Sequence, residues 1–333
     1  MNITICGGGN LGHVVAGVLA SQEDVSVRLL TQHPSEWSNE LLISDQEGKI
    51  YRGKLETISD DPEEVIPDAD YAILCLPGFA IRDELASIKP CLTANTVMGS
   101  IVSSTGFFFT ALDVLSEQTP LFGFQRVPYI SRINEYGRSA NLLGYKKSLS
   151  IAVERSNDKE QIRKDVERLF NTPTTLLKSH FEVSLTNSNP LLHTARLYTM
   201  WKDWNGEPLE RNPLFYAEWT DEASELLISM DGEFQRMLTK LPVADVSITP
   251  ILEYYESHDT QSLTEKIRGI KAFRGILSPM RPANGGYTPD FASRYFTEDF
   301  PYGMRFIVEC ADKYGAEIPI IKKIYNWGCL RLK

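Results

Sequence analysis

The first half of the chain alternates short apolar runs with segments of helical periodicity. Ile3–Cys6 and Val25–Leu30 are apolar runs of strand length, and Leu11–Leu19 between them has the apolar spacing of a helix. Strand, glycine turn, helix and strand make one βαβ unit. Further strands are predicted at 71–76, 96–102, 148–153 and 174–177, and further helices at 81–88, 107–115 and 159–170. This alternation predicts an α/β domain whose doubly wound, mainly parallel sheet has helices on both faces.

The pattern changes near His180, and beyond it almost no strand pattern is left. From Trp219 to Leu241 apolar residues recur at three- and four-residue spacing, which predicts a long amphipathic helix whose apolar stripe packs into a core. Shorter helices are predicted at 263–273, 306–314 and 320–327. The sequence therefore predicts an α/β domain at residues 1–180 and an all-α domain at residues 181–333.

A glycine-rich turn follows the first strand. Residues 7–12, Gly-Gly-Gly-Asn-Leu-Gly, fit the pattern G-x-G-x-x-G between a strand and a helix, the context that a dinucleotide-binding Rossmann fold requires. In that fold the first glycine allows a sharp turn, the second lets a pyrophosphate approach the backbone, and the third lets the helix pack closely. The alternative is a glycine turn without a ligand. We predict a Rossmann domain whose phosphate-binding residues are Gly7, Gly9, Asn10, Leu11 and Gly12.

The second strand bears on the choice between NAD and NADP. NAD-specific sites usually end this strand in Asp or Glu, which accepts hydrogen bonds from the ribose hydroxyls. Here it is followed by Thr31 and Gln32, which could donate to a 2′-phosphate, with Arg28 nearby or simply solvated. The cofactor is therefore NADP or NAD, with the preference going to NADP. Two other segments that follow strands are expected near the cofactor, at Pro77 and at Ser103, although both fit ordinary turns.

Composition narrows the range of partners. The formal net charge of −10 disfavours nucleic acid and anionic membranes, which need clustered positive charge. The five cysteines show no CxxC spacing and are expected to be reduced, so no metal site is predicted. No run is long and apolar enough for a transmembrane helix. We expect a cytoplasmic enzyme with small-molecule substrates, and a homodimer is left open.

One histidine stands out from the others. His193 follows Asn189 and Pro190, which have the residue types of an N-cap and of the first helical position, so His193 is expected in the first turn of a helix after the domain boundary. Clefts between domains commonly bind substrates, and a histidine there can transfer a proton near neutral pH. The alternative is a structural histidine. His13 is expected on a helix surface, and His180 and His258 in solvent.

A second polar feature lies at residues 294–303, Arg-Tyr-Phe-Thr-Glu-Asp-Phe-Pro-Tyr-Gly. Asp299 within it either caps the helix that starts near Pro301 or accepts a hydrogen bond from one nitrogen of His193. In the second case Asp299 would orient the imidazole and stabilise its charged form.

Three stretches together resemble a known family. NSNPLLHTA at 187–195, RYFTEDFPYG at 294–303 and GFQRVPYISR at 123–132, with the N-terminal GGGNLG, resemble the NAD(P)-dependent octopine/nopaline (opine) dehydrogenases. The resemblance spans most of the chain. It implies a Rossmann domain followed by an α-helical domain, and a catalytic His–Asp pair at His193 and Asp299.

The resemblance also implies a reaction. In this family an amino acid condenses with a 2-oxo acid, and NAD(P)H reduces the resulting imine. A histidine suits the proton transfers of such a condensation. Both substrates carry carboxylates, so guanidinium partners are expected, and the candidates are Arg126, Arg132 and Arg294.

Two other functions fit the nucleotide-binding pattern. One is an NADP-dependent dehydrogenase of a simpler 2-oxo acid or alcohol, of the ketopantoate reductase or glycerol-3-phosphate dehydrogenase type, which uses a lysine as its acid. The other is a non-catalytic NADP(H)-binding regulatory protein, in which His193 and Asp299 would lie too far apart to interact. Neither the amino acid nor the 2-oxo acid is specified by a motif.

Overall fold

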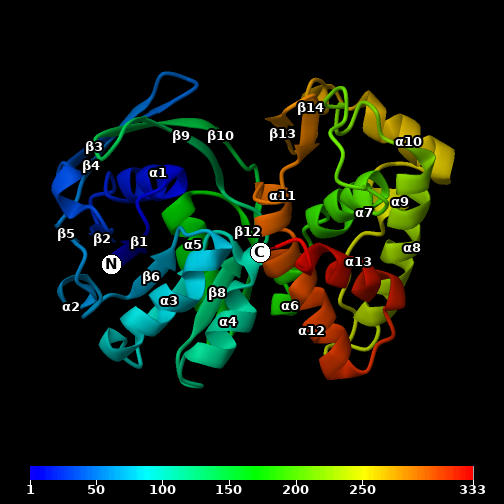
Figure 1. The fold of residues 1–333 in the computed structure, drawn as a ribbon. Coiled ribbons are helices and arrows are strands. Elements are labelled where there is room, and N and C mark those ends of the chain that lie inside the picture. The colour runs from blue at the N-terminus through cyan, green and yellow to red at the C-terminus, as the bar shows by residue number, and fades with distance from the viewer. Residues whose placement is uncertain (333) are drawn as a thin grey trace. The chain divides into compact units, whose positions relative to one another are not determined.

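A computed structural model describes residues 1–332 of the chain (Figure 1). It contains two compact units, Met1–Ser184 and the residues from Leu185 onward. The first unit is an α/β sandwich and the second is mainly helical, so the predicted fold class is confirmed.

An eight-stranded sheet forms the centre of the first unit, with the strand order β12-β11-β8-β7-β6-β1-β2-β5. Neighbouring strands run parallel except for β8 and β11, which are antiparallel. The short strands β5 and β8 were not predicted. The eight strands are β1 (Asn2–Cys6), β2 (Ser26–Leu30), β5 (Thr57–Ser59), β6 (Tyr71–Leu74), β7 (Val97–Ser100), β8 (Leu121–Phe124), β11 (Leu149–Glu154) and β12 (Thr174–Leu176).

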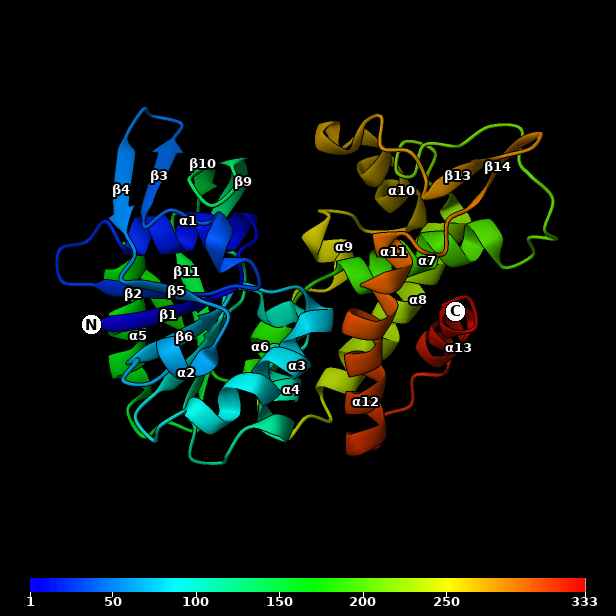
Figure 2. The same cartoon turned by 60° about the vertical axis from the view of Figure 1, so that its left-hand side comes forward.

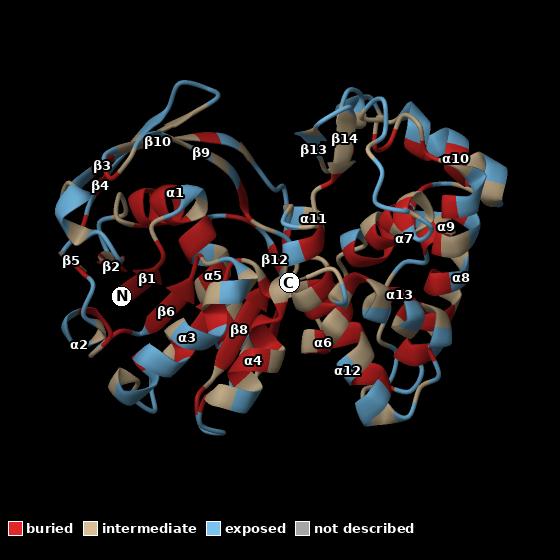
Figure 3. Cartoon of the chain, in the orientation of Figure 1, coloured by how far each residue is buried: buried red, intermediate tan, exposed pale blue. Residues whose placement is uncertain are grey.

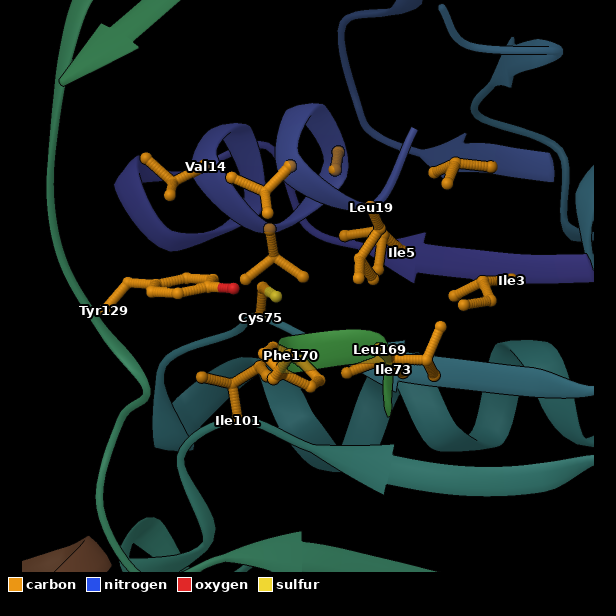
Figure 4. Packing of buried hydrophobic residues seen from close by; sticks show 14 of the residues in the cluster. Ile3, Ile5, Val14, Leu19, Ile73, Cys75, Ile101, Tyr129, Leu169 and Phe170 are labelled. Atoms are coloured by element: carbon orange, nitrogen blue, oxygen red, sulfur yellow. The ribbon is translucent and has the colours of Figure 1, made fainter. Parts of the chain in front are cut away.

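Helices cover both faces of this sheet, because successive side chains of a strand point to opposite faces. Within β6, Ile73 belongs to one hydrophobic core, while Ala72 and Leu74 belong to the other. The first core packs the sheet against α1 and α5, and Figure 4 shows Val14 and Leu19 above the strands. The second core packs it against α2, α3, α4 and α6. The helices are α1 (Asn10–Leu19), α2 (Pro62–Val65), α3 (Gly78–Ile88), α4 (Phe107–Val114), α5 (Lys159–Phe170) and α6 (His180–Ser184).

A second, four-stranded sheet of the first unit was not predicted. Its order is β4-β3-β10-β9, with β3 (Glu40–Asp45), β4 (Ile50–Lys54), β9 (Tyr129–Glu135) and β10 (Ser139–Tyr145). It packs over α1 (Figure 2). The approach is close at Gly17, where a Cβ atom would lie 2.4 Å from a side-chain carbon of Ile43. Exposed positions of these strands include apolar residues such as Leu42, Ile130 and Leu143, which blur the alternation of apolar and polar residues that marks a strand.

The second unit is helical apart from one hairpin. The long amphipathic pattern is α8 (Asp221–Leu238), whose apolar side is buried (Figure 3). The hairpin of β13 (Met280–Ala283) and β14 (Gly286–Pro289) was not predicted. The other helices are α7 (Asn189–Trp201), α9 (Ile251–Tyr254), α10 (Thr260–Gly269), α11 (Arg294–Thr297), the π-helical turn η5 (Phe300–Met304), α12 (Arg305–Tyr314) and α13 (Pro319–Cys329).

A buried carboxylate of α8 holds α13 in place. Glu233 is 2% exposed, and its two carboxylate oxygens accept hydrogen bonds from the backbone N–H groups of Ile320 and Ile321, each at 2.9 Å. The first N–H groups of a helix have no partner within the helix, and the helix dipole favours a negative charge there. A charged residue within the apolar stripe of α8 is thereby explained as the cap of a neighbouring helix.

Candidate functional site

The glycine turn of the first unit forms an open cradle at the start of α1. Gly7 adopts a φ of +116°, and a Cβ atom on Gly12 would lie 1.9 Å from the carbonyl oxygen of Gly7, so both positions require glycine. A Cβ atom on Gly9 would meet nothing within 4 Å. Gly9 is also the N-cap of α1, with no side-chain cap and no acid in the first turn. The free N–H groups and the open space beside Gly9 suit a pyrophosphate.

His13 supports this turn from behind, and its prediction as a helix-surface residue was wrong. It is fully buried, because the four-stranded sheet covers α1. Its Nε2 accepts a hydrogen bond from the backbone N–H of Gly137 at 2.7 Å, so its Nδ1 carries the proton and donates to the carbonyl of Gly9 at 2.9 Å. Burial lowers the pKa of His13, which favours the neutral ring that this network needs.

A cavity of about 320 Å³ opens beside the turn. It is bounded by the glycine turn, the segments that follow β2, β5 and β6, and the first turns of α3. A larger cavity of the same unit, about 810 Å³, shares none of these residues and does not include the turn. The smaller cavity is lined by Gly7, Gly8, Leu30, Thr31, Gln32, His33, Asp60, Pro62, Leu76, Pro77, Phe79, Ala80, Glu84, Ser87 and Tyr136.

The predicted cofactor residues take different places around this cavity. Thr31, Gln32 and Pro77 line it. Ser103 does not, because it is 1% exposed and its hydroxyl donates to the carbonyl of Ser100. The side chain of Asn10 accepts a hydrogen bond from the backbone N–H of Ile133 at 2.8 Å.

Asn10 and Leu11 contribute to the turn through the backbone at the start of α1. Arg28 points elsewhere, since it pairs with Glu56 and donates to the carbonyl of Pro67 at 2.6 Å. It is therefore unsuited to bind a 2′-phosphate.

The second unit brings His193 and Asp299 together. The Nδ1 of His193 lies 2.7 Å from a carboxylate oxygen of Asp299, and their side chains are only 12% and 14% exposed. An ionised carboxylate can only accept hydrogen bonds, so Nδ1 carries the proton and Nε2 is left as the reactive nitrogen. Asp299 follows α11 and caps no helix with its side chain, so the alternative of a capping residue is excluded.

The two segments meet because a proline packs against a glycine. Pro190 lies in the first turn of α7, one residue later than predicted because Ser188 is the N-cap. Gly303 lies in η5, and a Cβ atom there would come within 2.4 Å of the Cγ of Pro190. His193 stands three residues after this proline and Asp299 directly precedes η5. The close approach of α7 to η5 thus sets the distance between the imidazole and the carboxylate.

The hydroxyl of Tyr216 binds the other nitrogen of the imidazole, a contact that the sequence did not predict. Its hydroxyl lies 2.8 Å from Nε2 of His193 and also contacts the hydroxyl of Tyr295 by a hydrogen bond. Burial raises the pKa of Tyr216, and the neighbouring Tyr295 raises it further, so the phenol stays protonated and donates to the neutral imidazole. Asp299, His193, Tyr216 and Tyr295 therefore form one hydrogen-bonded chain.

The segment that carries Tyr216 is itself anchored. Arg196 of α7 is 5% exposed and donates to the carbonyl oxygens of Phe215 and Glu218, while Arg268 of α10 donates to the carbonyl of Trp219. Burial lowers the pKa of Arg196 to about 10, so it remains charged at neutral pH. No local motif marked Tyr216, because its role depends on this fold-back of the segment onto α7.

The three arginines predicted to bind substrate carboxylates are all exposed. Arg294 forms two hydrogen bonds with the carboxylate of Glu298, four residues later in the chain, and its side chain is 85% exposed. Arg126 and Arg132 are exposed residues of the first unit, Arg132 within β9. The pKa of Arg294 is raised, chiefly by its hydrogen bond with Glu298 and to a smaller extent by the charge of Asp299.

Two other histidines, His180 and His258, differ in their exposure. His180 was expected in solvent, but its side chain is 15% exposed and Nδ1 lies 2.9 Å from a carboxylate oxygen of Glu154. His258 is 83% exposed, as predicted. Among residues 1–332, no group of three or more His, Cys, Asp or Glu side chains is arranged to hold a metal ion. Within the same residues, no helix is both long and apolar enough to cross a bilayer.

Comparisons with known proteins find similarities along the whole chain. The family described as NAD/NADP octopine/nopaline dehydrogenase, alpha-helical domain, matches residues 176–331, and ketopantoate reductase PanE/ApbA matches residues 3–104. The chain is 29% identical to an opine dehydrogenase of Haliotis discus hannai, with 98% of the chain and 89% of the relative covered. It is 27% identical to a tauropine dehydrogenase of Arabella iricolor, with 98% and 90% covered.

A solved structure gives the same result for the fold. The chain is similar to octopine dehydrogenase with NADH and L-arginine, with a TM-score of 0.87 and 27% identity. The alignment covers 100% of this chain and 89% of that protein.

Proposed function

Because this chain belongs to the octopine/nopaline (opine) dehydrogenase family, we propose that it is an opine dehydrogenase whose acid–base group is His193. The reaction joins the amine of an amino acid to the carbonyl carbon of a 2-oxo acid, with loss of water and reduction of the imine to a secondary amine. The observation that carries the residue assignment is the partly buried 2.7 Å contact between Asp299 and Nδ1 of His193.

The glycine cradle suits the dinucleotide. Gly7, Gly9 and Gly12 leave room for the pyrophosphate at the N-terminus of α1, and Thr31, Gln32 and Pro77 line the adjoining cavity. When bound, NAD(P)H supplies the hydride that reduces the imine. The residues of the chain bind and orient the cofactor and move protons.

Proton transfer is assigned to the second unit. When substrate displaces the hydroxyl of Tyr216, the neutral ring accepts at Nε2 a proton from the amine nitrogen that adds to the carbonyl carbon. The resulting imidazolium then donates this proton to the hydroxyl that leaves the carbinolamine as water. Asp299 holds the proton on Nδ1 and stabilises the charged ring. Tyr216 is a positioning residue, because its hydroxyl fixes the ring from the opposite side.

The substrate carboxylates require cationic partners. Arg126 and Arg132 stay candidates, and Arg294 is the weaker one because Glu298 already binds its guanidinium. Charge and composition remain the basis for predicting a cytoplasmic location without nucleic-acid or membrane partners. Whether the chain forms a homodimer stays open.

Oxidation of NADH and NADPH with a panel of 2-oxo acids, each tested with and without amino acids, examines the reaction class. Oxidation that needs both substrates is expected. Oxidation by a 2-oxo acid alone would contradict the proposal and favour an enzyme of the ketopantoate reductase type. Cofactor binding without any turnover would favour the regulatory alternative.

Replacing His193 examines the residue assignment. His193→Ala and Asp299→Asn are each expected to lower kcat by about 10²- to 10⁴-fold, the usual contribution of a general acid–base group. NADH affinity should stay unchanged, because the cradle and its cavity lie in the first unit. His258→Ala, which removes an exposed histidine, is the control. Turnover of His193→Ala near the wild-type level would remove His193 from the mechanism.

A further inference from the structure

Acidic side chains line the cavity beside the glycine turn. Its lining includes two carboxylate side chains, Asp60 and Glu84, but no lysine or arginine. Sites that accept the 2′-phosphate of NADP supply a cation for it, commonly an arginine. Arg28 is on the neighbouring strand but is held by Glu56 and the carbonyl of Pro67.

Asp60 lies beside the end of β2, where the sequence of that strand has no acid. β5 pairs in parallel with β2, with Ser59 opposite Leu30, so the residues after the two strands, Asp60 and Thr31, leave the sheet side by side. The N–H of Thr31 donates to the carbonyl of Ser59 at 2.9 Å and fixes this pairing. The acid that NAD-binding folds usually carry at the end of the second strand is therefore supplied by the strand next to it.

The carboxylate of Asp60 is not used by the fold. The next residue, Asp61, caps α2 by accepting a hydrogen bond from the backbone N–H of Glu63 at 2.9 Å. Asp60 forms no side-chain hydrogen bond or ion pair with any residue in the described range 1–332, and it is exposed. An exposed carboxylate that faces a cavity and has no structural partner is free to accept from a ligand hydroxyl.

Glu84 contributes a second carboxylate to the lining of this cavity. It lies in α3 and is partly buried, no lysine or arginine among residues 1–332 forms an ion pair with it, and burial raises the pKa of its carboxyl group. Two like charges around one small cavity repel a dianionic phosphate, whereas a ribose diol can donate to a carboxylate.

We propose that Asp60 makes this enzyme selective for NAD(H) over NADP(H), by accepting hydrogen bonds from the adenosine ribose and repelling a 2′-phosphate. This inference rests on the proposed function only in assigning the cavity to the cofactor. The proposal reverses the preference for NADP that Thr31 and Gln32 suggested. Both residues line the same cavity as the carboxylate of Asp60, which is distant in the sequence and is brought there by the pairing of β5 with β2.

Equilibrium binding tests the proposal without requiring opine synthesis. The dissociation constants of NADH and NADPH are measured by nicotinamide fluorescence for the wild type, Asp60→Asn, Asp60→Lys, Glu84→Gln and the control Glu64→Gln. Glu64 is an exposed acid of α2 that does not line the cavity, so the control makes the same change in net charge.

The wild type is expected to bind NADH at least tenfold more tightly than NADPH, since a hydrogen bond to a charged group is worth about that much or more. Asp60→Asn should shrink this ratio about tenfold and Asp60→Lys should invert it, while Glu64→Gln leaves it unchanged. Raising the salt concentration should narrow the wild-type ratio, because solvent-exposed charges are screened.

Equal or tighter binding of NADPH by the wild type would overturn the proposal, and so would an unchanged ratio in both Asp60 variants. A ratio that moves only in Glu84→Gln would also overturn it. These outcomes are independent of the reaction class, since an enzyme that fails to make an opine still reports its cofactor ratio. Conversely, opine synthesis that runs equally well with tightly bound NADPH would leave the proposed function intact and refute the role of Asp60.

Discussion

At the scale of single residues, the imidazole of His193 is held from both sides. Asp299 accepts from Nδ1, and the hydroxyl of Tyr216 donates to Nε2. The aromatic rings of Phe215 and Tyr295 contact the imidazole edge-on, with centroids 5.9 Å and 4.8 Å away. A ring with two fixed hydrogen bonds loses little freedom when it reaches the geometry of proton transfer.

Removing the hydroxyl of Tyr216 tests this positioning. Tyr216→Phe keeps the stacking on Phe273, whose ring centroid lies 4.3 Å away, but leaves Nε2 without its donor. We expect kcat to fall about fivefold with KM little changed, since about 1 kcal/mol of orientation is lost. Tyr254→Phe is the control, because Tyr254 is 53% exposed. A change in KM alone would show that Tyr216 contacts substrate and does not act through His193.

The lowered pKa of His13 predicts how the free energy of unfolding depends on pH. Its folded-state pKa is lowered, chiefly by burial, so the unfolded chain binds a proton that the folded chain excludes. Stability is therefore full above the unfolded pKa of about 6.5 and is lost as the pH falls through that value toward the lower folded pKa. Thermal melts between pH 7.5 and 5 should show this loss.

The same thermal melts on a His13 variant separate the contribution of His13 to this pH dependence from that of other titratable groups. His13→Ala should be less stable at pH 7.5, because the N–H of Gly137 loses its acceptor, but it should lose less stability on acidification than the wild type. His258→Ala should follow the wild type at every pH. An acid-induced loss of equal size in His13→Ala would assign it to other groups.

At the scale of elements, the His193–Asp299 contact depends on how closely α7 and η5 approach. Pro190 and Gly303 meet at the contact, and a π-helical turn such as η5 often marks a functional site. Prolines fit the first turn of a helix without loss of a hydrogen bond, so α7 can begin against its neighbour. The motifs that resemble the family are thus the two halves of one packing contact.

Gly303→Ala tests this contact. The added methyl would lie 2.4 Å from a ring carbon of Pro190, and a proline ring cannot move aside as a flexible chain can. We expect a loss of about 1–3 kcal/mol in the free energy of unfolding and a fall in kcat larger than any change in NADH affinity. Chemical denaturation and steady-state kinetics measure both.

Gly232→Ala in α8 is the matched control. Its added methyl would meet only the flexible end of Arg236, at 3.5 Å, and alanine favours a helix over glycine by about 0.5–1 kcal/mol. Unaltered turnover in Gly303→Ala would mean that the contact between Pro190 and Gly303 does not set the geometry of the His193–Asp299 pair.

At the scale of the whole molecule, cofactor binding and proton transfer are assigned to different units. The glycine cradle lies in Met1–Ser184, whereas His193, Tyr216 and Asp299 lie in the residues from Leu185 onward. The net charge of −10 does not prevent binding of carboxylate substrates, since a few local cations are sufficient.

Cofactor-dependent stabilisation checks this assignment. NADH at 100 times its dissociation constant should stabilise the wild type by about 2.7 kcal/mol, and His193→Ala by the same amount. Gly9→Ala should fold normally, because its methyl would enter open space, but the methyl obstructs the pyrophosphate and should reduce the effect of NADH. Full stabilisation of Gly9→Ala by NADH would show that the cofactor does not approach the chain there.

The sequence by itself determined the features that rest on local chemistry. The alternation of strands and helices, the helix at residues 159–170 and the glycine turn at Gly7–Gly12 follow from short-range periodicity and from backbone sterics. The pairing of His193 with Asp299 could also be predicted, because both lie in stretches typical of one family. The four-stranded sheet could not, since exposed apolar residues such as Leu42 and Ile130 blur its alternation and its strands pair across the chain.

Only the tertiary structure decided which side chains share a site. His13 is buried because a distant sheet covers α1, Tyr216 reaches Nε2 of His193 because Arg196 holds its segment, and Asp60 stands beside Thr31 because β5 pairs with β2. Each of these placements depends on contacts between residues far apart in the chain. Such contacts depend on burial and pairing in three dimensions, which no short stretch of sequence records.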